Sequence, residues 1–295
     1  MESQHEELEM RLGTTRVLEI EDPTELAREH RARGYTAAKC PPVSLDDPAH
    51  IRAVEKAFAE EDVVIAELHS ITAIEDAGNL IDPDLEQRGA WHEHICSNLA
   101  LADEVGAVCL LELPGTYMPN SCYLPHPMNL TDECRDLIVE RVREVVDAVN
   151  PKRTKFVLEM MPCIHPNSPE SYAALLEAVD RDGFAVHLDP VNVISSPDRY
   201  FDTGRVIKEC FDKLGHAIVS CHAKDVTMTN AYPIGVVESR AGTGVLDYKT
   251  YLTELSRLPV DTPLLTEHLA TEAEYDLARD HIKGVASELG LAFAS

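Results

Sequence analysis

The sequence predicts a single-domain α/β protein with the (β/α)₈ TIM-barrel fold. Short apolar runs, typical of buried parallel strands, alternate with segments of helical period along the chain. Eight such pairs fit into 295 residues, a usual size for this barrel, whereas a doubly wound open sheet more often has about five to seven strands. No linker or low-complexity stretch marks a second unit, so we expect one domain over residues 1–295, with 1–13 as a short N-terminal extension.

The first half of the chain contains four predicted strand and helix pairs. The apolar runs that we assign to strands are residues 15–20, 35–40, 63–69 and 108–115. The segments that we assign to helices are residues 22–33, 48–61, 85–105 and 131–149. Gly34 and Gly106 follow two of these helices, as expected for residues that end a helix. Thr131 opens the last of them with an imperfect capping box.

The last four predicted strands share an unusual feature, since each ends in an acidic residue or a histidine. They are residues 155–159, 184–189, 217–222 and 263–269, and they place Glu159, Asp189, His222 and Glu267 at or near their ends. Buried carboxylates need a partner, and the carboxyl ends of barrel strands all face one mouth. We therefore expect these four side chains to converge and to bind one divalent ion. The oxygen-rich set favours Mn²⁺, with Mg²⁺, Co²⁺ or Zn²⁺ as alternatives.

Several stretches resemble the xylose-isomerase-like TIM barrels of the sugar phosphate isomerase/epimerase superfamily. They are Val-Leu-Glu (157–159), His-Leu-Asp (187–189), Cys-His-Ala-Lys-Asp (221–225), Gly-Thr-Gly-Val-Leu-Asp-Tyr (242–248) and Leu-Thr-Glu-His-Leu (265–269). The resemblance implies that Glu159 and Glu267 are metal ligands and also the catalytic acid and base. It further implies metal-assisted proton abstraction next to the carbonyl of a non-phosphorylated sugar, that is, an isomerase or epimerase.

Two departures from the epimerase pattern keep other reactions open. Asp189 is followed three residues later by Asn192, where epimerases usually carry histidine, and the segment 226–239 before Arg240 is long. A C-glycoside-cleaving or lyase-type member of the superfamily is therefore the alternative. An endonuclease-IV-like barrel or a non-catalytic sugar-binding barrel is less favoured, because the chain is acidic and all four metal positions are present.

Six further residues are candidates for substrate binding at the predicted mouth. Lys224 shares a strand face with His222, and His165 lies in a proline-rich loop after Glu159. The complete set is His69, Glu112, His165, Asn192, Lys224 and Arg240. Glu67 and Glu112 are equally compatible with hydrogen-bonding roles at the barrel rim, and His187 is expected to point into the barrel.

The composition and charge of the chain argue against some classes of binding partner. Lys and Arg total 26 against 52 acidic residues, which gives a net charge of −26 and argues against nucleic acid and anionic membranes. The eight cysteines form no Cys-x-x-Cys pair, the N-terminal residues do not resemble a signal peptide, and no apolar stretch reaches the about 20 residues that span a bilayer. We expect a cytoplasmic homo-oligomer, a dimer or tetramer, that acts on a small-molecule carbohydrate.

Overall fold

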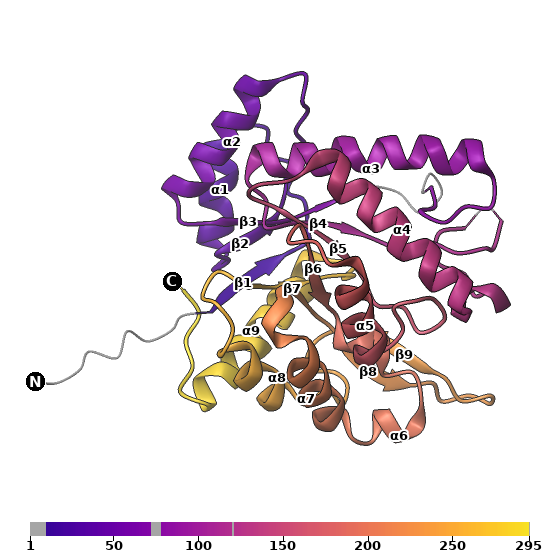
Figure 1. Cartoon of the computed structure of the whole chain (residues 1–295). Coiled ribbons are helices and arrows are strands. Elements are labelled where there is room, and N and C mark those ends of the chain that lie inside the picture. The colour runs from indigo at the N-terminus through magenta and orange to yellow at the C-terminus, as the bar shows by residue number, and fades with distance from the viewer. Residues whose placement is uncertain (1–9, 72–77, 120, 295) are drawn as a thin grey trace, which may run out of the picture.

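The computed structural model describes residues 10–71, 78–119 and 121–294, and these form a closed barrel of parallel strands surrounded by helices (Figure 1). The strands follow the order β1-β10-β7-β6-β5-β4-β3-β2 around the barrel, and β1 pairs with β10 to close it. Their bounds are β1 Arg11–Thr14, β2 Ala37–Lys39, β3 Val64–His69, β4 Cys109–Glu112, β5 Lys155–Leu158, β6 Phe184–Leu188, β7 Ile218–Ala223 and β10 Pro263–Thr266. The predicted (β/α)₈ barrel is confirmed.

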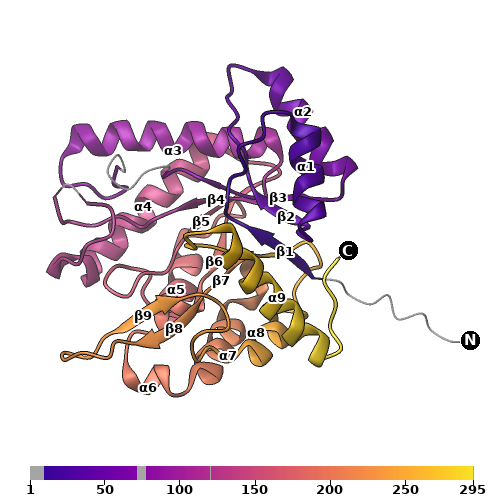
Figure 2. The same ribbon diagram turned by 180° about the vertical axis from the view of Figure 1, so that it is seen from behind.

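Helices cover the outside of the barrel in both views (Figures 1 and 2). The α-helices are α1 Pro23–Ala32, α2 Pro48–Glu60, α3 Leu85–Val105, α4 Asp132–Val149, α5 Pro169–Val179, α6 Pro197–Tyr200, α7 Thr203–Leu214, α8 Tyr248–Leu255 and α9 Glu272–Glu288. Short 3₁₀ helices span Pro127–Leu130, Pro190–Val193 and Gly215–Ala217. The predicted caps hold: the Thr131 hydroxyl accepts from Cys134 N, and Gly106 ends α3 with a positive φ of 74°.

The first strand lies earlier than the sequence indicates. β1 begins at Arg11, whereas the apolar run at 15–20 lies beyond the strand and leaves Val17 45% exposed. Gly13 permits the close approach of β1 and β2, because a Cβ there would lie 2.6 Å from Ala37 O. Residues 11–13 therefore belong to the barrel and not to an N-terminal extension, and residues 1–9 lie outside the described part of the chain.

The long segment before Arg240 contains a hairpin that sequence analysis did not identify. β8 Asp225–Met228 and β9 Val236–Ser239 form a separate two-stranded antiparallel sheet. In both views this hairpin extends away from the barrel on the side of α5 and α6 (Figures 1 and 2). It begins only three residues after His222, so its base lies beside the strand ends where the predicted site is located.

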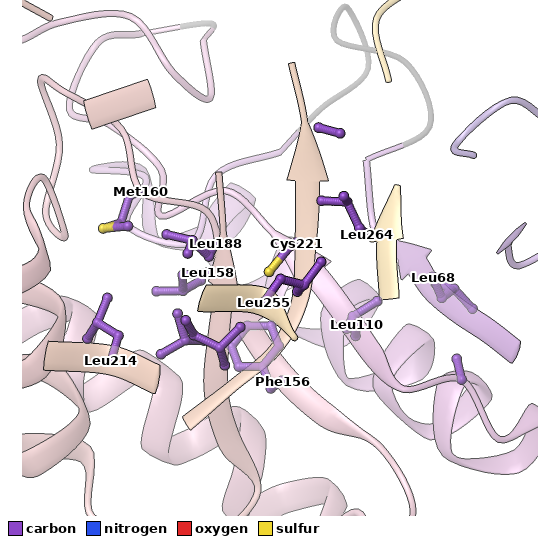
Figure 3. Packing of buried hydrophobic residues seen from close by; sticks show 14 of the residues in the cluster. Leu68, Leu110, Phe156, Leu158, Met160, Leu188, Leu214, Cys221, Leu255 and Leu264 are labelled. Carbon is purple, nitrogen blue, oxygen red and sulfur yellow. The ribbon is translucent and has the colours of Figure 1, made fainter. Parts of the chain in front are cut away.

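The core has an outer layer between strands and helices and a smaller layer inside the barrel. Outward-facing strand residues such as Leu110 and Leu158 share one buried cluster with helical residues, part of which is shown in Figure 3. Inside the barrel, small apolar side chains such as Ala185 and Ala66 leave room for buried polar groups. Among the described residues, no helix is both long enough and apolar enough to cross a membrane.

Candidate metal centre and substrate cavity

The four predicted metal ligands converge at one side of the barrel mouth. His222 lies in β7, and the other three directly follow β5, β6 and β10. These four strands are neighbours in the barrel, and each residue offers one donor atom within 4.8 Å of the others. Asp189, His222 and Glu267 are buried, whereas Glu159 is partly exposed. The structure therefore brings together, from four strands, the residues that the sequence predicted would meet.

Local hydrogen bonds hold these side chains in place. Asp189 caps the 3₁₀ helix that follows β6, with its Oδ1 accepting from Val191 N at 2.9 Å. Asn192, on the same short helix, donates from Nδ2 to Glu159 Oε1 at 2.7 Å. Thus the residue that stands where epimerases usually have histidine orients one of the two predicted catalytic glutamates.

Glu67 supports His222 from inside the barrel, which corrects its expected position at the rim. The carboxylate is fully buried, and its Oε2 lies 3.0 Å from His222 Nε2 and 3.1 Å from His69 Nε2. His187 points inwards as expected, with its Nδ1 2.7 Å from Ser220 Oγ and 3.3 Å from Glu67 Oε1. Burial alone would raise the pKa of Glu67, but the imidazoles of His222 and His187 outweigh it and hold that pKa well below its usual value.

The opposite ring nitrogen of His222 faces the cluster. His222 Nδ1 lies 2.6 Å from Glu267 Oε1. Burial lowers the pKa of His222, but the carboxylates of Glu267 and Glu67 outweigh burial and raise that pKa well above its ordinary value. With Nε2 directed at Glu67, Nδ1 is the atom that can face a cation once its proton is released. Carboxylates that hold the second nitrogen of a ligating histidine in this way are a common feature of metal sites.

Lys224 contributes the positive charge nearest to the cluster. Its Nζ lies 2.5 Å from Glu267 Oε1, 2.9 Å from Asp189 Oδ2, 3.4 Å from Glu238 Oε2 and 4.0 Å from Glu159 Oε1. Burial lowers its pKa, but Asp189 and Glu267 outweigh burial and raise that pKa well above the usual value. The ammonium of Lys224 and a protonated His222 are still outnumbered by the carboxylates of Glu159, Asp189, Glu238 and Glu267, so the site stays negative, and a divalent cation would neutralise it.

The donor atoms fit such an ion. Within the described chain, Asp189 Oδ2, His222 Nδ1 and Glu267 Oε1 are buried and make no hydrogen bond of acceptable geometry, although each lies close to an opposite charge. Buried polar atoms without hydrogen bonds are rare and need an explanation. Three carboxylates and one imidazole form a hard donor set suited to Mn²⁺, Mg²⁺ or Co²⁺ and compatible with Zn²⁺.

A cavity of about 480 Å³ opens beside this cluster. Four of the six predicted substrate-binding residues line it: His69, Glu112, Asn192 and Lys224. His165 and Arg240 are not among the described residues that line it. Arg240 follows the hairpin and donates to Ala241 O at 3.0 Å. Apolar side chains complete the lining, namely Ile71, Leu111, Leu113, Tyr123 and Met161. The cavity thus has both an acidic and an apolar part, as ligand pockets usually do.

Glu112 differs from the other acidic residues of the cavity. It is 2% exposed, and its carboxylate accepts hydrogen bonds from Ser70 Oγ and Leu113 N. Burial raises the pKa of Glu112 to about 7, because these hydrogen bonds only partly offset the loss of solvent. This group can therefore hold a proton near neutrality.

Two cavity residues, Glu238 and His268, were missed by sequence analysis. Glu238 lies on β9, in the long segment that was noted but not assigned to strands. His268 directly follows Glu267 and has a φ of 56°, an uncommon left-handed conformation for a residue other than glycine. Its position next to a predicted ligand was a usable signal, whereas that of Glu238 depends on the hairpin register.

Comparison with solved structures supports the fold. A xylose isomerase-like TIM barrel protein from Mycobacterium smegmatis, solved in complex with magnesium, matches with a TM-score of 0.64 and 16% identity over 98% of both chains. The 3-keto-D-glucoside 4-epimerase of E. coli matches with a TM-score of 0.66 and 16% identity, over 95% of this chain and 100% of its own. Endonuclease IV from Thermus thermophilus matches with a TM-score of 0.69 and 15% identity, over 94% of this chain and 99% of its own. These identities establish the fold alone.

Sequence comparison identifies the family. No curated protein matches the chain. The family model described as the xylose isomerase-like TIM barrel matches residues 26–285, which is most of the sequence. The match includes all four residues of the candidate metal centre. The chain therefore belongs to the xylose isomerase-like TIM barrel family.

Proposed function

We propose that this protein is a divalent-metal-dependent isomerase or epimerase that moves a proton next to the carbonyl of a non-phosphorylated sugar or sugar derivative. The observation that carries the proposal is the position of Glu159 and Glu267. Both belong to the candidate metal centre, and both also line the cavity beside it. Each can thus serve as a ligand and also reach a bound substrate. Mn²⁺ is the favoured ion, with Mg²⁺, Co²⁺ and Zn²⁺ as alternatives.

The chemistry divides between the ion and the side chains. A divalent ion held by Glu159, Asp189, His222 and Glu267 would polarise a substrate carbonyl and so acidify the neighbouring C–H. Glu159 and Glu267 follow β5 and β10, which are separated in the barrel by β6 and β7. The two carboxylates therefore approach a ligand from different strands, so that one can accept a proton and the other can return it. Lys224 can donate a hydrogen bond to a substrate oxygen.

Charge argues for a substrate without phosphate. The cavity contains Glu112, Glu159, Glu238 and Glu267, and among the described residues Lys224 is its one lysine or arginine. Lys224 already lies beside several carboxylates. A phosphate bound here would meet no arginine among the described residues that line the cavity, and arginine is a side chain that often recognises phosphate. The same acidic lining disfavours DNA as a substrate.

A lyase-type or C-glycoside-cleaving reaction is the second candidate, and Glu112 favours it. Its pKa of about 7 allows a protonated carboxyl group in the cavity, and such a group can protonate a leaving oxygen or carbon. In that reaction only one of the two metal-centre glutamates is needed as a base. A homo-oligomeric state and a cytoplasmic location, expected from the sequence, stay predictions.

Proton exchange with solvent tests the proposal. The Mn²⁺-loaded protein is incubated in deuterated water with neutral ketoses, including D-fructose, D-tagatose and a 3-keto-glucoside, and NMR follows deuterium incorporation and product. We expect both in the wild type. Glu159→Gln and Glu267→Gln should each stop net turnover while retaining metal, because an amide cannot accept the proton. The control is Glu177→Gln, a change at an exposed position on α5, which should behave as wild type.

The pattern of exchange separates the two reactions. In an epimerase, one of the two variants retains the glutamate on the face of the substrate that carries the proton, and this variant should still incorporate deuterium into the substrate. With the opposite epimer as substrate, the other variant should do so instead. Release of a leaving group, with Glu112→Gln also inactive, would instead favour the lyase-type reaction. Full activity in Glu159→Gln or Glu267→Gln with metal bound would remove that glutamate from the chemistry.

A further inference from the structure

The β8–β9 hairpin is fixed at its base by one buried carboxylate. Asp225 Oδ1 accepts from Val226 N and Leu246 N, both at 2.8 Å, and Oδ2 accepts from Gly242 N and Gly244 N, both at 3.0 Å. Four backbone donors on one carboxylate tie the first residue of the hairpin to the Gly-Thr-Gly loop. The hairpin therefore leaves the barrel in a defined direction.

The register of the hairpin turns Glu238 towards the barrel mouth. Glu238 lies directly opposite Val226, and such pairs project to the same face of an antiparallel sheet. Val226 is fully buried, so this face points inwards. Val237, the neighbouring residue on β9, belongs to the other face and is 43% exposed. An element outside the barrel thus supplies a carboxylate to the cavity.

His268 holds Glu238 in place. Its Nδ1 lies 3.1 Å from each oxygen of Glu238, and its Nε2 lies 3.4 Å from Glu267 Oε2. The left-handed backbone of His268, φ 56°, costs conformational energy that the surrounding contacts must offset. The imidazole consequently joins the hairpin to the strand that carries a predicted catalytic residue.

Glu238 retains hydrogen-bonding capacity for a ligand. A carboxylate offers about four lone-pair sites, and here Lys224 at 3.4 Å and His268 are the neighbouring charged groups. The side chain of Glu238 is 39% exposed and lines the cavity. A sugar hydroxyl can donate to this carboxylate, whereas a ligand carboxylate or phosphate at the same place would be repelled.

We propose that Glu238, held by His268, is a specificity-determining substrate contact beside the metal centre, which accepts hydrogen bonds from sugar hydroxyls and rejects sugars that are anionic there. This inference rests on the proposed function, since it assigns a further contact to the same ligand. Glu238 would thereby select neutral polyhydroxylated substrates, although it lies on the hairpin and not on a barrel strand.

Matched ligands test the role of Glu238. Calorimetry measures the dissociation constants of D-fructose and D-fructose 6-phosphate for the Mn²⁺-loaded wild type, Glu238→Gln, Glu238→Asp and Val237→Gln. In Glu238→Gln we expect about tenfold weaker D-fructose binding from loss of a charged hydrogen bond, and about tenfold tighter 6-phosphate binding from loss of repulsion. Glu238→Asp keeps the charge on a shorter side chain, so it should weaken D-fructose binding yet still reject the phosphate. Val237→Gln, on the outer face, should change neither constant.

The outcomes distinguish this inference from the proposed function. One outcome would overturn the inference while the wild type still binds D-fructose. If Glu238→Gln keeps the wild-type unfolding temperature and the wild-type ratio of the D-fructose and D-fructose 6-phosphate dissociation constants, Glu238 is not a substrate contact. A fall in unfolding temperature with that ratio unchanged would show a structural role only, and would also overturn the inference. If the metal-loaded wild type binds neither ligand, the proposed function fails and the inference fails with it.

Discussion

Glu112 provides a quantitative test of the electrostatics inside the barrel mouth. The carboxyl group is 2% exposed, and burial raises its pKa from 4.5 to about 7. Because this pKa is raised, the folded protein binds the proton more tightly than the unfolded chain. The resulting stability is fully present below about pH 4.5 and is lost as the pH rises through about 7.

The size of this effect follows from the two pKa values. Each pKa unit corresponds to about 1.36 kcal/mol, so the difference between about 7 and 4.5 amounts to about 3 kcal/mol. Glu112→Gln is neutral at every pH and can still accept from Leu113 N, which lies 2.8 Å from Oε1. The free energy of unfolding of Glu112→Gln, minus that of wild type, should thus grow by about 3 kcal/mol between pH 4.5 and pH 8.

Urea unfolding in the presence of a chelator, at a series of pH values, measures this difference without a contribution from metal binding. Glu177→Gln, at an exposed position, serves as the control for the loss of a glutamate outside the cavity. A difference for Glu112→Gln that stays constant from pH 4.5 to pH 8 would refute the reasoning, because Glu112 would then titrate alike in the folded and unfolded states.

Two further predictions concern the residues that support the site. Glu67→Gln should weaken Mn²⁺ binding by about 10- to 100-fold, because one amide cannot replace a carboxylate shared by the imidazoles around it. Calorimetry measures this affinity, and a value for the variant equal to that of the wild type would contradict the supporting role of Glu67. Gly244→Ala should lower the free energy of unfolding by about 1–3 kcal/mol, since its Cβ would lie 2.2 Å from Val226 O. Gly89→Ala, where a Cβ meets nothing within 4 Å, is the control and should be neutral or stabilising.

The sequence was sufficient to predict the barrel and the convergence of the metal-centre residues. Apolar strands and amphipathic helices have different periods, so their alternation is visible without coordinates. A charged residue at the end of an apolar run is also visible, and barrel topology brings such residues to one mouth. Glu159, Asp189, His222 and Glu267 were located in this way.

Other features depend on depth and register, which a single sequence does not reveal. Glu67 and His69 share one face of β3, but only their different depths make Glu67 a buried support and His69 a cavity residue. The sequence analysis placed the first strand too late because residues 15–20 are more apolar than β1. β1 contains Gly13, where a side chain would collide with Ala37 on β2. Glu238 enters the cavity through antiparallel pairing that its local sequence does not specify.

Metal content measured together with thermal unfolding provides the most direct test of the proposed metal centre. Elemental analysis of the purified wild type should find about one divalent ion per chain. After chelation, returning Mn²⁺ at about 100 times its dissociation constant should stabilise the fold by about 2.7 kcal/mol. Asp189→Ala removes a buried donor of the cluster and should lose most of this stabilisation. A wild type that is metal-free as purified, and that gains no stability from Mn²⁺, Mg²⁺, Co²⁺ or Zn²⁺, would contradict the assignment of Glu159, Asp189, His222 and Glu267 as a metal site.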